Sequence, residues 1–233
     1  GVVPSSEQAL GQWVYALVAP FPTIADEVSF DDLQQSWHGE QAGPFAGRPL
    51  LLSSETLAVF RAAWGEPAAG SVEVLSEDEL PTYAWENRPS WAIIPFERLE
   101  PHWKVLVIDG QSPVRKEFHS ETYPLAINFG ILGSVDPLEI DGIPVTNLDP
   151  DKLTVLVMTG VTALVRATAF AMENHGMTFP AQDIGDWLRD ADVTHISNEV
   201  SFYGDCPYPN PYPGPLYFCS KVEYFDLIKD VEA

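Results

Sequence analysis

The chain has 233 residues, of which 45% are hydrophobic, and its 34 acidic and 12 basic residues give a formal net charge of −22. This hydrophobic fraction excludes wholesale disorder and suits one large domain or two small ones. The negative field would repel a phosphate backbone, so nucleic acid is excluded as an expected partner, whereas a cationic ligand or a metal ion would be attracted.

Strands and helices are predicted to alternate through the first half. Strands are predicted at 13–19, 48–52, 72–75, 90–96, 103–110 and 124–131, and helices at 30–39, 54–65 and 76–87. Ser29 and Ser53 or Ser54 stand where N-caps of two helices belong, and Ser76 with Glu79 matches a capping box. This alternation predicts an α/β unit.

A stretch rich in Gly, Pro and Asp separates this unit from a second one. We predict a first unit at residues 1–135, a linker at 136–152 and a second unit at 153–233. The second unit is predicted to hold a buried parallel strand at 153–160, helices at 161–176 and 182–191, a strand at 193–199, and a last helix capped by Ser220. The predicted fold class is therefore α/β with two α/β units, and because no strand follows the last helix, a fragment of a longer protein is expected.

The second half carries the segments VLVMTGVTALVR, WLRDADVTHISNEVSF and LYFCSKVEYFDLIKDVEA. Their order and spacing resemble the start of the CapA-like bacterial capsule (poly-gamma-glutamate) synthesis proteins, whose fold is similar to that of calcineurin-like metallophosphoesterases. The resemblance implies a parent protein of capsule or exopolymer synthesis or export. If that parent is an enzyme, the resemblance implies metal-assisted phosphoester or related hydrolysis with Mn, Mg or Zn.

Asn198 and Glu199 follow a predicted strand, where α/β folds place ligands, and both offer oxygen to a hard cation. The resemblance makes them the predicted metal ligands and, with Arg166, the predicted catalytic residues. The alternative is that Asn198 and Glu199 brace the loop that follows. Val161 stands where the family has a metal-binding aspartate, so the predicted metal site is incomplete.

Gly160 and Thr162 mark a predicted strand-to-helix turn. Its backbone N–H groups would hold an anion, unless the turn is only structural. Arg166, on the next helix, would approach a phosphate or carboxylate, or form a surface ion pair. His195 is predicted to be a structural strand residue and His175 to end a helix, where a cation suits the dipole.

The first half carries YALVAPFPTIADEVSFDDLQQSWHG, LLLSSETLAVFRAAWG and SWAIIPFERLEPHWKVLVIDGQSP. These segments resemble a lobe of a type 2 extracytoplasmic solute-binding protein of the phosphate-binding kind, in which a Ser-Gly-Thr element holds the anion. The matching residues are Ser54, Glu55 and Thr56, and the glutamate would repel phosphate. Ser53, Ser54 and Thr56 are the predicted ligand-binding residues, with N-capping as the alternative. The rival to an enzyme is a non-catalytic binding module for a small anion or anionic polymer.

No apolar run reaches the roughly 18 residues of a membrane span, and the first residues lack the features of a signal peptide. Residues alone leave the chain either cytoplasmic or a processed piece of a secreted protein. The resemblance implies an extracytoplasmic place (cell surface, secreted or lipoprotein) and allows a membrane-anchored parent.

Cys206 and Cys219 either form a disulfide, which an oxidising compartment would favour, or stay free thiols. The loop at 203–217 is rich in proline and tyrosine and is called the Pro/Tyr loop below. Its tyrosines form either a stacking platform or a packed lid: Tyr203, Tyr208, Tyr212 and Tyr217.

Overall fold

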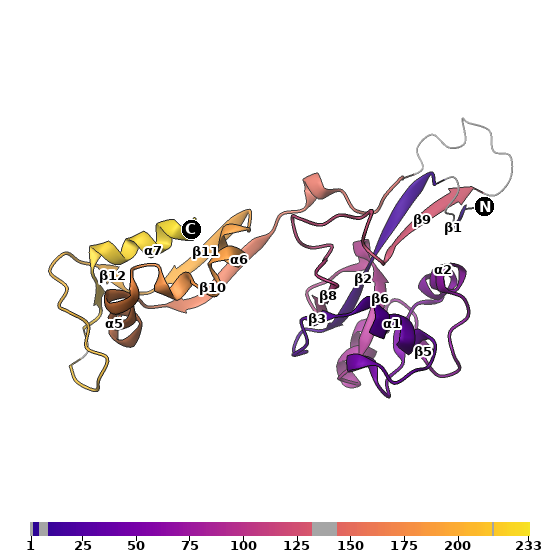
Figure 1. Ribbon diagram of the computed structural model, residues 1–233, viewed down its shortest axis with the longest axis horizontal. Coiled ribbons are helices and arrows are strands. Elements are labelled where there is room, and N and C mark those ends of the chain that lie inside the picture. The colour runs from indigo at the N-terminus through magenta and orange to yellow at the C-terminus, as the bar shows by residue number, and fades with distance from the viewer. Residues whose placement is uncertain (1, 5–8, 132–143, 216) are drawn as a thin grey trace. The chain divides into compact units, whose positions relative to one another are not determined.

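The structure is a computed structural model that describes residues 2–4, 9–131, 144–215 and 217–233 (Figure 1). The chain divides into two compact units, unit 1 at Gly1–Asp151 and unit 2 at Lys152–Ala233. Each unit has its own hydrophobic core, and the predicted mixture of helices and strands is confirmed. Residues 136–143 of the predicted linker lie outside the described residues. Within the described part of the chain, no helix is both long and apolar enough to cross a membrane.

A mixed sheet forms the centre of unit 1, in the order β1-β9-β2-β6-β4-β5, with β7 also paired to β2. The strands are β1 (Val2–Pro4), β2 (Gly11–Pro20), β4 (Leu50–Leu52), β5 (Val72–Val74), β6 (Trp91–Pro95), β7 (Trp103–Val105) and β9 (Ala126–Ile131). β4 is parallel to β5 and β6, whereas β2 is antiparallel to β6, β7 and β9. The carboxyl ends of β4, β5 and β6 therefore meet at the same edge.

Helices cover both faces of this sheet. One face packs against α1 (Phe30–Trp37) and α2 (Ser54–Trp64), and the other against α3 (Leu80–Glu86). Successive residues of β2 point to opposite faces, so that Leu17 packs in the first cluster and Val18 in the second. Because both faces are buried, the central part of β2 is apolar without interruption.

Hydroxyl caps start two of these helices as predicted. The Ser29 and Ser53 hydroxyls each accept a hydrogen bond from the backbone N–H three residues further on. The Ser76 hydroxyl donates to the Glu79 carboxylate at 2.6 Å, just before α3 begins. The predicted starts of α1 and α2 are therefore confirmed, whereas the third helix begins at Leu80, later than the predicted start at Ser76.

The strand predicted at 103–110 is divided. Leu106 still donates its backbone N–H to Leu17 of β2, but the next residue donates to Asp26. The chain thereby leaves the sheet and forms a separate parallel pair of β3 (Glu27–Val28) with β8 (Val107–Ile108).

Residues 145–148, which the sequence places in the linker, pack on unit 1. The Asn147 side chain accepts from the backbone N–H of Val14 and donates to the Val14 carbonyl, each at 2.8 Å. Glycine at position 11 permits the close approach, since a Cβ on Gly11 would lie 2.5 Å from the Val145 carbonyl oxygen. This segment completes the edge of β2 beyond the end of β6.

Unit 2 is built on two parallel strands, β10 (Leu156–Thr162) and β11 (Val193–Asn198). Its helices are α5 (Arg166–His175), α6 (Gly185–Arg189) and α7 (Phe225–Asp230), and its second strand pair is β12 (Ser201–Phe202) with β13 (Cys219–Ser220). Short 3-10 turns in the two units occupy Gly43–Phe45, Phe96–Arg98, Pro150–Lys152, Phe179–Ala181 and Val222–Tyr224. The core of unit 2 includes Leu164, Met172, Leu188, Tyr224 and Ile228.

The strand predicted at 153–160 lies further along the chain and is much less buried than expected. Leu156, Met158 and Val161 of β10 are all more than half exposed, while Val157 and Thr159 are partly buried. The prediction of a strand inside a parallel sheet is wrong for the described residues, because β10 pairs with β11 alone.

Two further local predictions in unit 2 are wrong. The helix expected from residue 161 begins at Arg166, since β10 continues further than predicted. Ser220 does not cap the last helix. It lies in β13, where its buried hydroxyl donates to the Leu164 carbonyl at 2.8 Å, and a 3-10 turn precedes α7.

Candidate functional site

A cavity of about 650 Å³ lies on the α3 side of the sheet in unit 1. Its wall combines the start of α2, one side of α3, the end of β6 and the segment that leads from β6 to β7. Ser53 follows β4 and Pro95 ends β6, so part of the wall lies where the carboxyl ends of parallel strands meet. Open α/β sheets bind ligands at such an edge, and the volume suits a small organic molecule.

Two of the predicted ligand-binding residues, Ser53 and Thr56, line this cavity. Both are buried, and the Ser53 hydroxyl accepts from the backbone N–H of Thr56 and donates to the Thr56 hydroxyl, each at 3.2 Å. Ser54 is exposed and donates to Glu55 at 3.0 Å. Ser53 is the N-cap of α2, and the predicted role of these three residues in binding a ligand stays a prediction.

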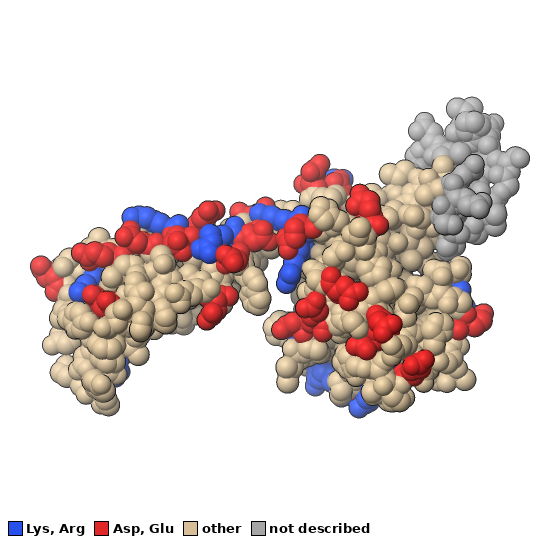
Figure 2. Space-filling view, in the orientation of Figure 1, with Lys and Arg blue, Asp and Glu red and all other residues tan. Residues whose placement is uncertain are grey.

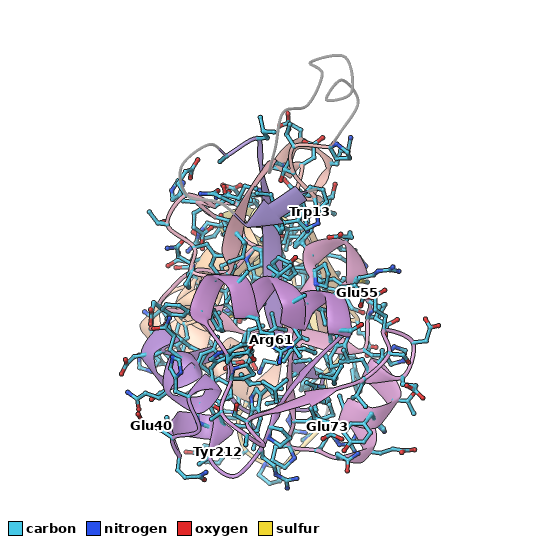
Figure 3. The ribbon with its side chains drawn as sticks, turned by 90° about the vertical axis from the view of Figure 1, so that its right-hand side faces the viewer. Trp13, Glu40, Glu55, Arg61, Glu73 and Tyr212 are labelled. Carbon is cyan, nitrogen blue, oxygen red and sulfur yellow. A yellow bond between two sulfur atoms is a disulfide. The ribbon has the colours of Figure 1, made fainter. Side chains whose placement is uncertain are left out.

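Glu55 lies in the first turn of α2 (Figure 3). Hydrogen bonds from its own backbone N–H and from the hydroxyls of Ser54 and Ser53 lower the pKa of this carboxyl below its ordinary value. The donors that a bound anion would need at the start of α2 are therefore directed at groups of the chain itself.

Four carboxylates line the cavity, and two of them have a basic neighbour. Arg98 lies 2.7 Å from Glu77, and His102 lies 3.6 Å from Glu100. The other two carboxylates, Asp78 and Glu86, form no ion pair with any residue of the described part of the chain. Figure 2 shows Asp and Glu spread over the visible face of unit 1, with Lys and Arg in fewer places.

Two indole rings contribute to the same wall. Trp103 is buried with 9% of its surface exposed, whereas Trp85 on α3 is 44% exposed. The guanidinium of Arg88 stacks on the Trp85 ring, 3.8 Å from its centre. Arg88 is not among the residues that line the cavity. Carboxylates and indoles thus dominate the accessible chemistry of the wall.

Three of the other predicted site residues lie at the carboxyl ends of β10 and β11 in unit 2. Thr162 is the register partner of Asn198, and the Glu199 backbone N–H donates to the Thr162 carbonyl at 3.1 Å. The Asn198 side chain donates to the Val200 carbonyl at 2.9 Å, which braces the chain after the strand. The structure therefore brings three predicted residues together at one strand edge, with the Asn198 amide engaged locally.

Gly160 and Arg166 do not form the predicted anion-binding turn. Gly160 lies within β10, at a register shift between Met158 and Val161, so no strand-to-helix turn exists there. Arg166 is exposed at the start of α5, with a positive φ of 49°, and makes no ion pair with a described residue. Among the described residues, no group of three His, Cys, Asp or Glu side chains is placed to hold a metal ion.

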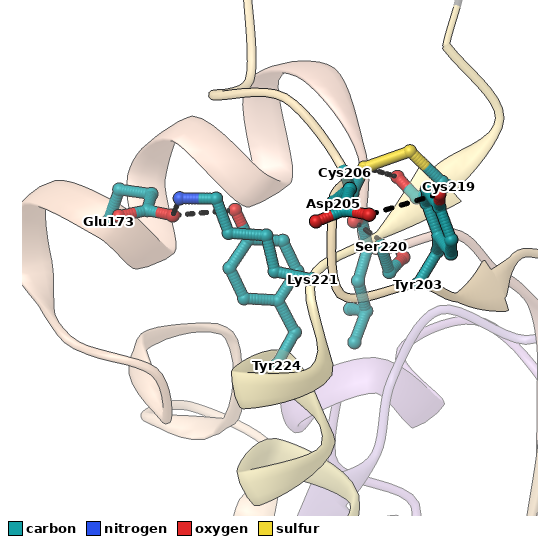
Figure 4. Close-up of a disulfide and its surroundings, with 9 residues drawn as sticks. Glu173, Tyr203, Asp205, Cys206, Cys219, Ser220, Lys221 and Tyr224 are labelled. Carbon is teal, nitrogen blue, oxygen red and sulfur yellow. Dashed lines mark hydrogen bonds and ion pairs between the residues drawn. A yellow bond between two sulfur atoms is a disulfide. The ribbon is translucent and has the colours of Figure 1, made fainter.

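Cys206 and Cys219 are bonded to each other as a disulfide at the base of the Pro/Tyr loop (Figure 4). All four loop tyrosines are more than half exposed, and Tyr208 also packs edge-on against Phe170. The hollow beneath this loop measures only about 30 Å³, too small for a sugar ring. The tyrosines therefore line no ligand-sized cavity in the described structure.

A polar cluster ties α5 to the segment before α7. The Glu173 carboxylate accepts from Lys221 at 2.5 Å and from the Tyr224 hydroxyl at 2.8 Å (Figure 4). These hydrogen bonds lower the pKa of Glu173, while burial and the bond to Glu173 raise the pKa of Tyr224. The cluster is satisfied internally, so it is structural.

No family model matches the chain, and no curated protein matches it. Among the solved structures that are similar to the chain, three each align with 55% of its length. An ABC-type phosphate transport receptor from Vibrio cholerae has 14% identity, a TM-score of 0.47 and 64% of its own length covered. A candidate phosphate ABC transporter substrate-binding protein with bound phosphate, from Clostridium perfringens, has 9% identity, a TM-score of 0.41 and 63% covered. A possible phosphate binding protein from Planctomyces limnophilus has 12% identity, a TM-score of 0.39 and 54% covered.

All three neighbours are described as phosphate receptors or phosphate-binding proteins, and none of the three is a capsule-synthesis protein. The chain spans less than two thirds of the length of each. The similarity is slight and concerns fold alone, so any function has to be argued from the cavity and its chemistry.

The sequence alone did not point to the acidic and aromatic residues of the cavity wall. Asp78, Trp85 and Glu86 belong to a segment that the sequence marks only as a capped helix. They match no motif, and they become a wall only because residues 98–103 fold beside α3. The one available signal was the density of acidic and aromatic residues in 76–87.

Proposed function

We propose that the chain is part of a non-catalytic, extracytoplasmic binding module whose ligand site is the cavity of unit 1. The observation that carries the proposal is the cavity of about 650 Å³ at the carboxyl ends of β4 and β6, with aromatic, hydroxyl and charged groups in its wall. The disulfide of unit 2 supports a place outside the cytoplasm, since such bonds persist in oxidising compartments.

The substitution Thr82→Phe tests this proposal by filling the cavity. Thr82 is an exposed residue of α3 that lines the cavity, so a phenyl ring there removes space without disturbing the core. A ligand at 100 times its Kd stabilises the folded state by about 2.7 kcal/mol, and Thr82→Phe is expected to remove most of that gain. The loss is measured by thermal shift and calorimetric titration of both proteins with small cationic, anionic and neutral solutes.

Ala62→Phe is the matched control, because Ala62 is exposed on α2 and does not line the cavity. It should leave binding unchanged. Equal loss of binding in both variants, or no binding of any solute by the unaltered chain, would contradict the assignment of the cavity. The small anion or anionic polymer predicted from the sequence is one class in this panel.

Unit 2 supports a second candidate, the opening part of a CapA-like, metal-dependent phosphoesterase domain of capsule or exopolymer synthesis. The favouring observation is that Thr162, Asn198 and Glu199 lie together at the carboxyl ends of two parallel strands. On this hypothesis Glu199 and Asn198 would offer oxygen ligands to Mn, Mg or Zn, and the metal would supply Lewis-acid chemistry at a phosphoester.

Metal titration tests the second candidate. If Glu199 is a ligand, Mn²⁺ should raise the melting temperature of the chain in a chelator-sensitive way. Glu199→Gln should then weaken Mn²⁺ binding by about tenfold or more, because a carboxylate binds a hard cation far better than an amide. Glu223→Gln, an exposed change elsewhere in unit 2, serves as the control. Identical Mn²⁺ affinity of both variants would exclude Glu199 as a ligand.

A further inference from the structure

The wall of the unit 1 cavity carries more negative than positive charge. Arg98 is the single Lys or Arg among its lining residues, and it is already paired with Glu77. Asp78 and Glu86 have no such partner among the described residues. A bound anion would add to this negative charge, whereas a bound cation would neutralise it.

The indole rings also favour a positively charged ligand. Tryptophan offers the best aromatic face for a cation, and both Trp85 and Trp103 line the cavity. The protein itself places a guanidinium on one of these rings, since Arg88 stacks on Trp85 at 3.8 Å. Arg88 itself does not line the cavity, whereas Trp85 does.

The donors at the start of α2 that would hold an anion are already used. The Ser53 hydroxyl and the Thr56 backbone N–H bond to each other, and the Glu55 carboxylate lies in the first turn of the same helix. A phosphate or carboxylate would have to displace these contacts and overcome the Glu55 charge. The start of α2 thus offers a bound anion few free donors, while the wall presents carboxylates and indole rings to a ligand.

From this combination we infer that the cavity of unit 1 binds a small organic cation of the alkylammonium or guanidinium class, held by Asp78 and Glu86 and by the rings of Trp85 and Trp103. The inference rests on the proposed function, because it names the ligand class of the same cavity. It departs from the anion that the sequence resemblance implies.

A matched pair of probes isolates the charge. Choline and 3,3-dimethylbutan-1-ol have nearly the same shape, and only choline is positively charged. Agmatine adds a guanidinium and an ammonium, and inorganic phosphate represents the anions. With the whole chain, calorimetry is expected to show choline or agmatine binding at least about tenfold more tightly than the neutral alcohol. Raising the ionic strength from about 0.01 M to 0.1 M shortens the screening length from about 30 Å to 10 Å. This change should weaken the binding of choline and agmatine and leave the binding of the neutral alcohol unchanged.

Variants of Asp78 and Glu86 test whether these two carboxylates cause the preference for cations. The double change Asp78→Asn/Glu86→Gln keeps shape and removes both charges, so cation binding should weaken by about tenfold while binding of the neutral alcohol stays the same. The control Glu40→Gln/Glu121→Gln removes two charges from exposed positions of unit 1 that do not line the cavity. It should change cation affinity less than about twofold.

The indole N–H signals of ¹⁵N-labelled protein show where a probe binds, with Trp85→Phe and Trp103→Phe assigning the two relevant resonances. Shifts of these signals with choline or agmatine support the inference. If instead phosphate or the neutral alcohol shifts them and the cations bind no more tightly, the cation inference is wrong and the binding module stands. If no probe moves either signal, the proposed function fails together with the inference.

Discussion

Replacing Phe60 with alanine is expected to lower the unfolding free energy of unit 1 by about 3–5 kcal/mol. The side chain is fully buried, and its ring lies 4.5 Å from Trp64, 5.1 Å from Tyr15 and 6.5 Å from Trp37, centre to centre. Truncation would leave a void among stiff aromatic rings that cannot close over it. Because α2 and its N-cap supply Thr56 and Ser53 to the cavity wall, ligand affinity should fall as well.

Hydrogen exchange followed by mass spectrometry measures this loss for each unit separately. Peptides from β2 and β6 should exchange much faster in Phe60→Ala, while peptides from α5 and α7 in unit 2 act as an internal reference. Phe60→Leu is the graded control, with an expected cost below about 1.5 kcal/mol. Unchanged protection of β2 in Phe60→Ala would show that this aromatic cluster does not hold α2 on the sheet.

Removing the disulfide is expected to have the second large effect, confined to unit 2. The bond joins residues 13 positions apart, and a closed loop of about this length stabilises a fold by about 3 kcal/mol. The double variant Cys206→Ser/Cys219→Ser should therefore raise exchange in α5 and α7, which share a core with the strands beside the disulfide. For a unit of this size the melting temperature should fall by about 10 °C or more.

Reduction of the unaltered protein supplies a check that needs no substitution. A thiol reductant should reproduce the exchange pattern of the double variant, and peptides from β2 should not respond. Equal protection of α5 and α7 in the oxidised, reduced and serine-substituted chains would show that the β12–β13 pairing holds the loop without the bond.

The first half could be predicted well because its signals are local. Ser29 and Ser53 each stand directly before a segment with the apolar spacing of a helix, which marks them as caps. The uninterrupted apolar run of β2 indicates a strand that is covered on both faces. The break between β7 and β8 was missed, because Leu106 and Val107 are equally good strand residues. Which strand each one pairs with depends on β2 and β3, far away in sequence.

The second half was harder to predict because the same local signals had other uses. Apolar residues around 153–160 predict a buried strand only if strands lie on both sides, and β10 has β11 alone. Ser220 resembles a cap, yet its hydroxyl finds the Leu164 carbonyl across the core of unit 2. Such partners are set by tertiary packing, which no short window of sequence contains.

The candidate site shows the same division. Ser53 and Thr56 were found because a helix start carries a recognisable pattern. The carboxylates of Asp78 and Glu86 resemble any solvated helix face, and only the path of the chain after β6 turns that face into a wall. The net negative charge of the whole chain did indicate an attraction for cations, and the wall of the cavity also carries more negative than positive side chains.

The distribution of tryptophan has a practical consequence for spectroscopy. Six of the seven, at 13, 37, 64, 85, 91 and 103, belong to unit 1, and several of them are buried. Trp187, in unit 2, is 68% exposed and already surrounded largely by water. Intrinsic fluorescence of the intact chain therefore reports almost entirely on unit 1. An emission-monitored denaturation curve would look like a single step even when unit 2 has melted first.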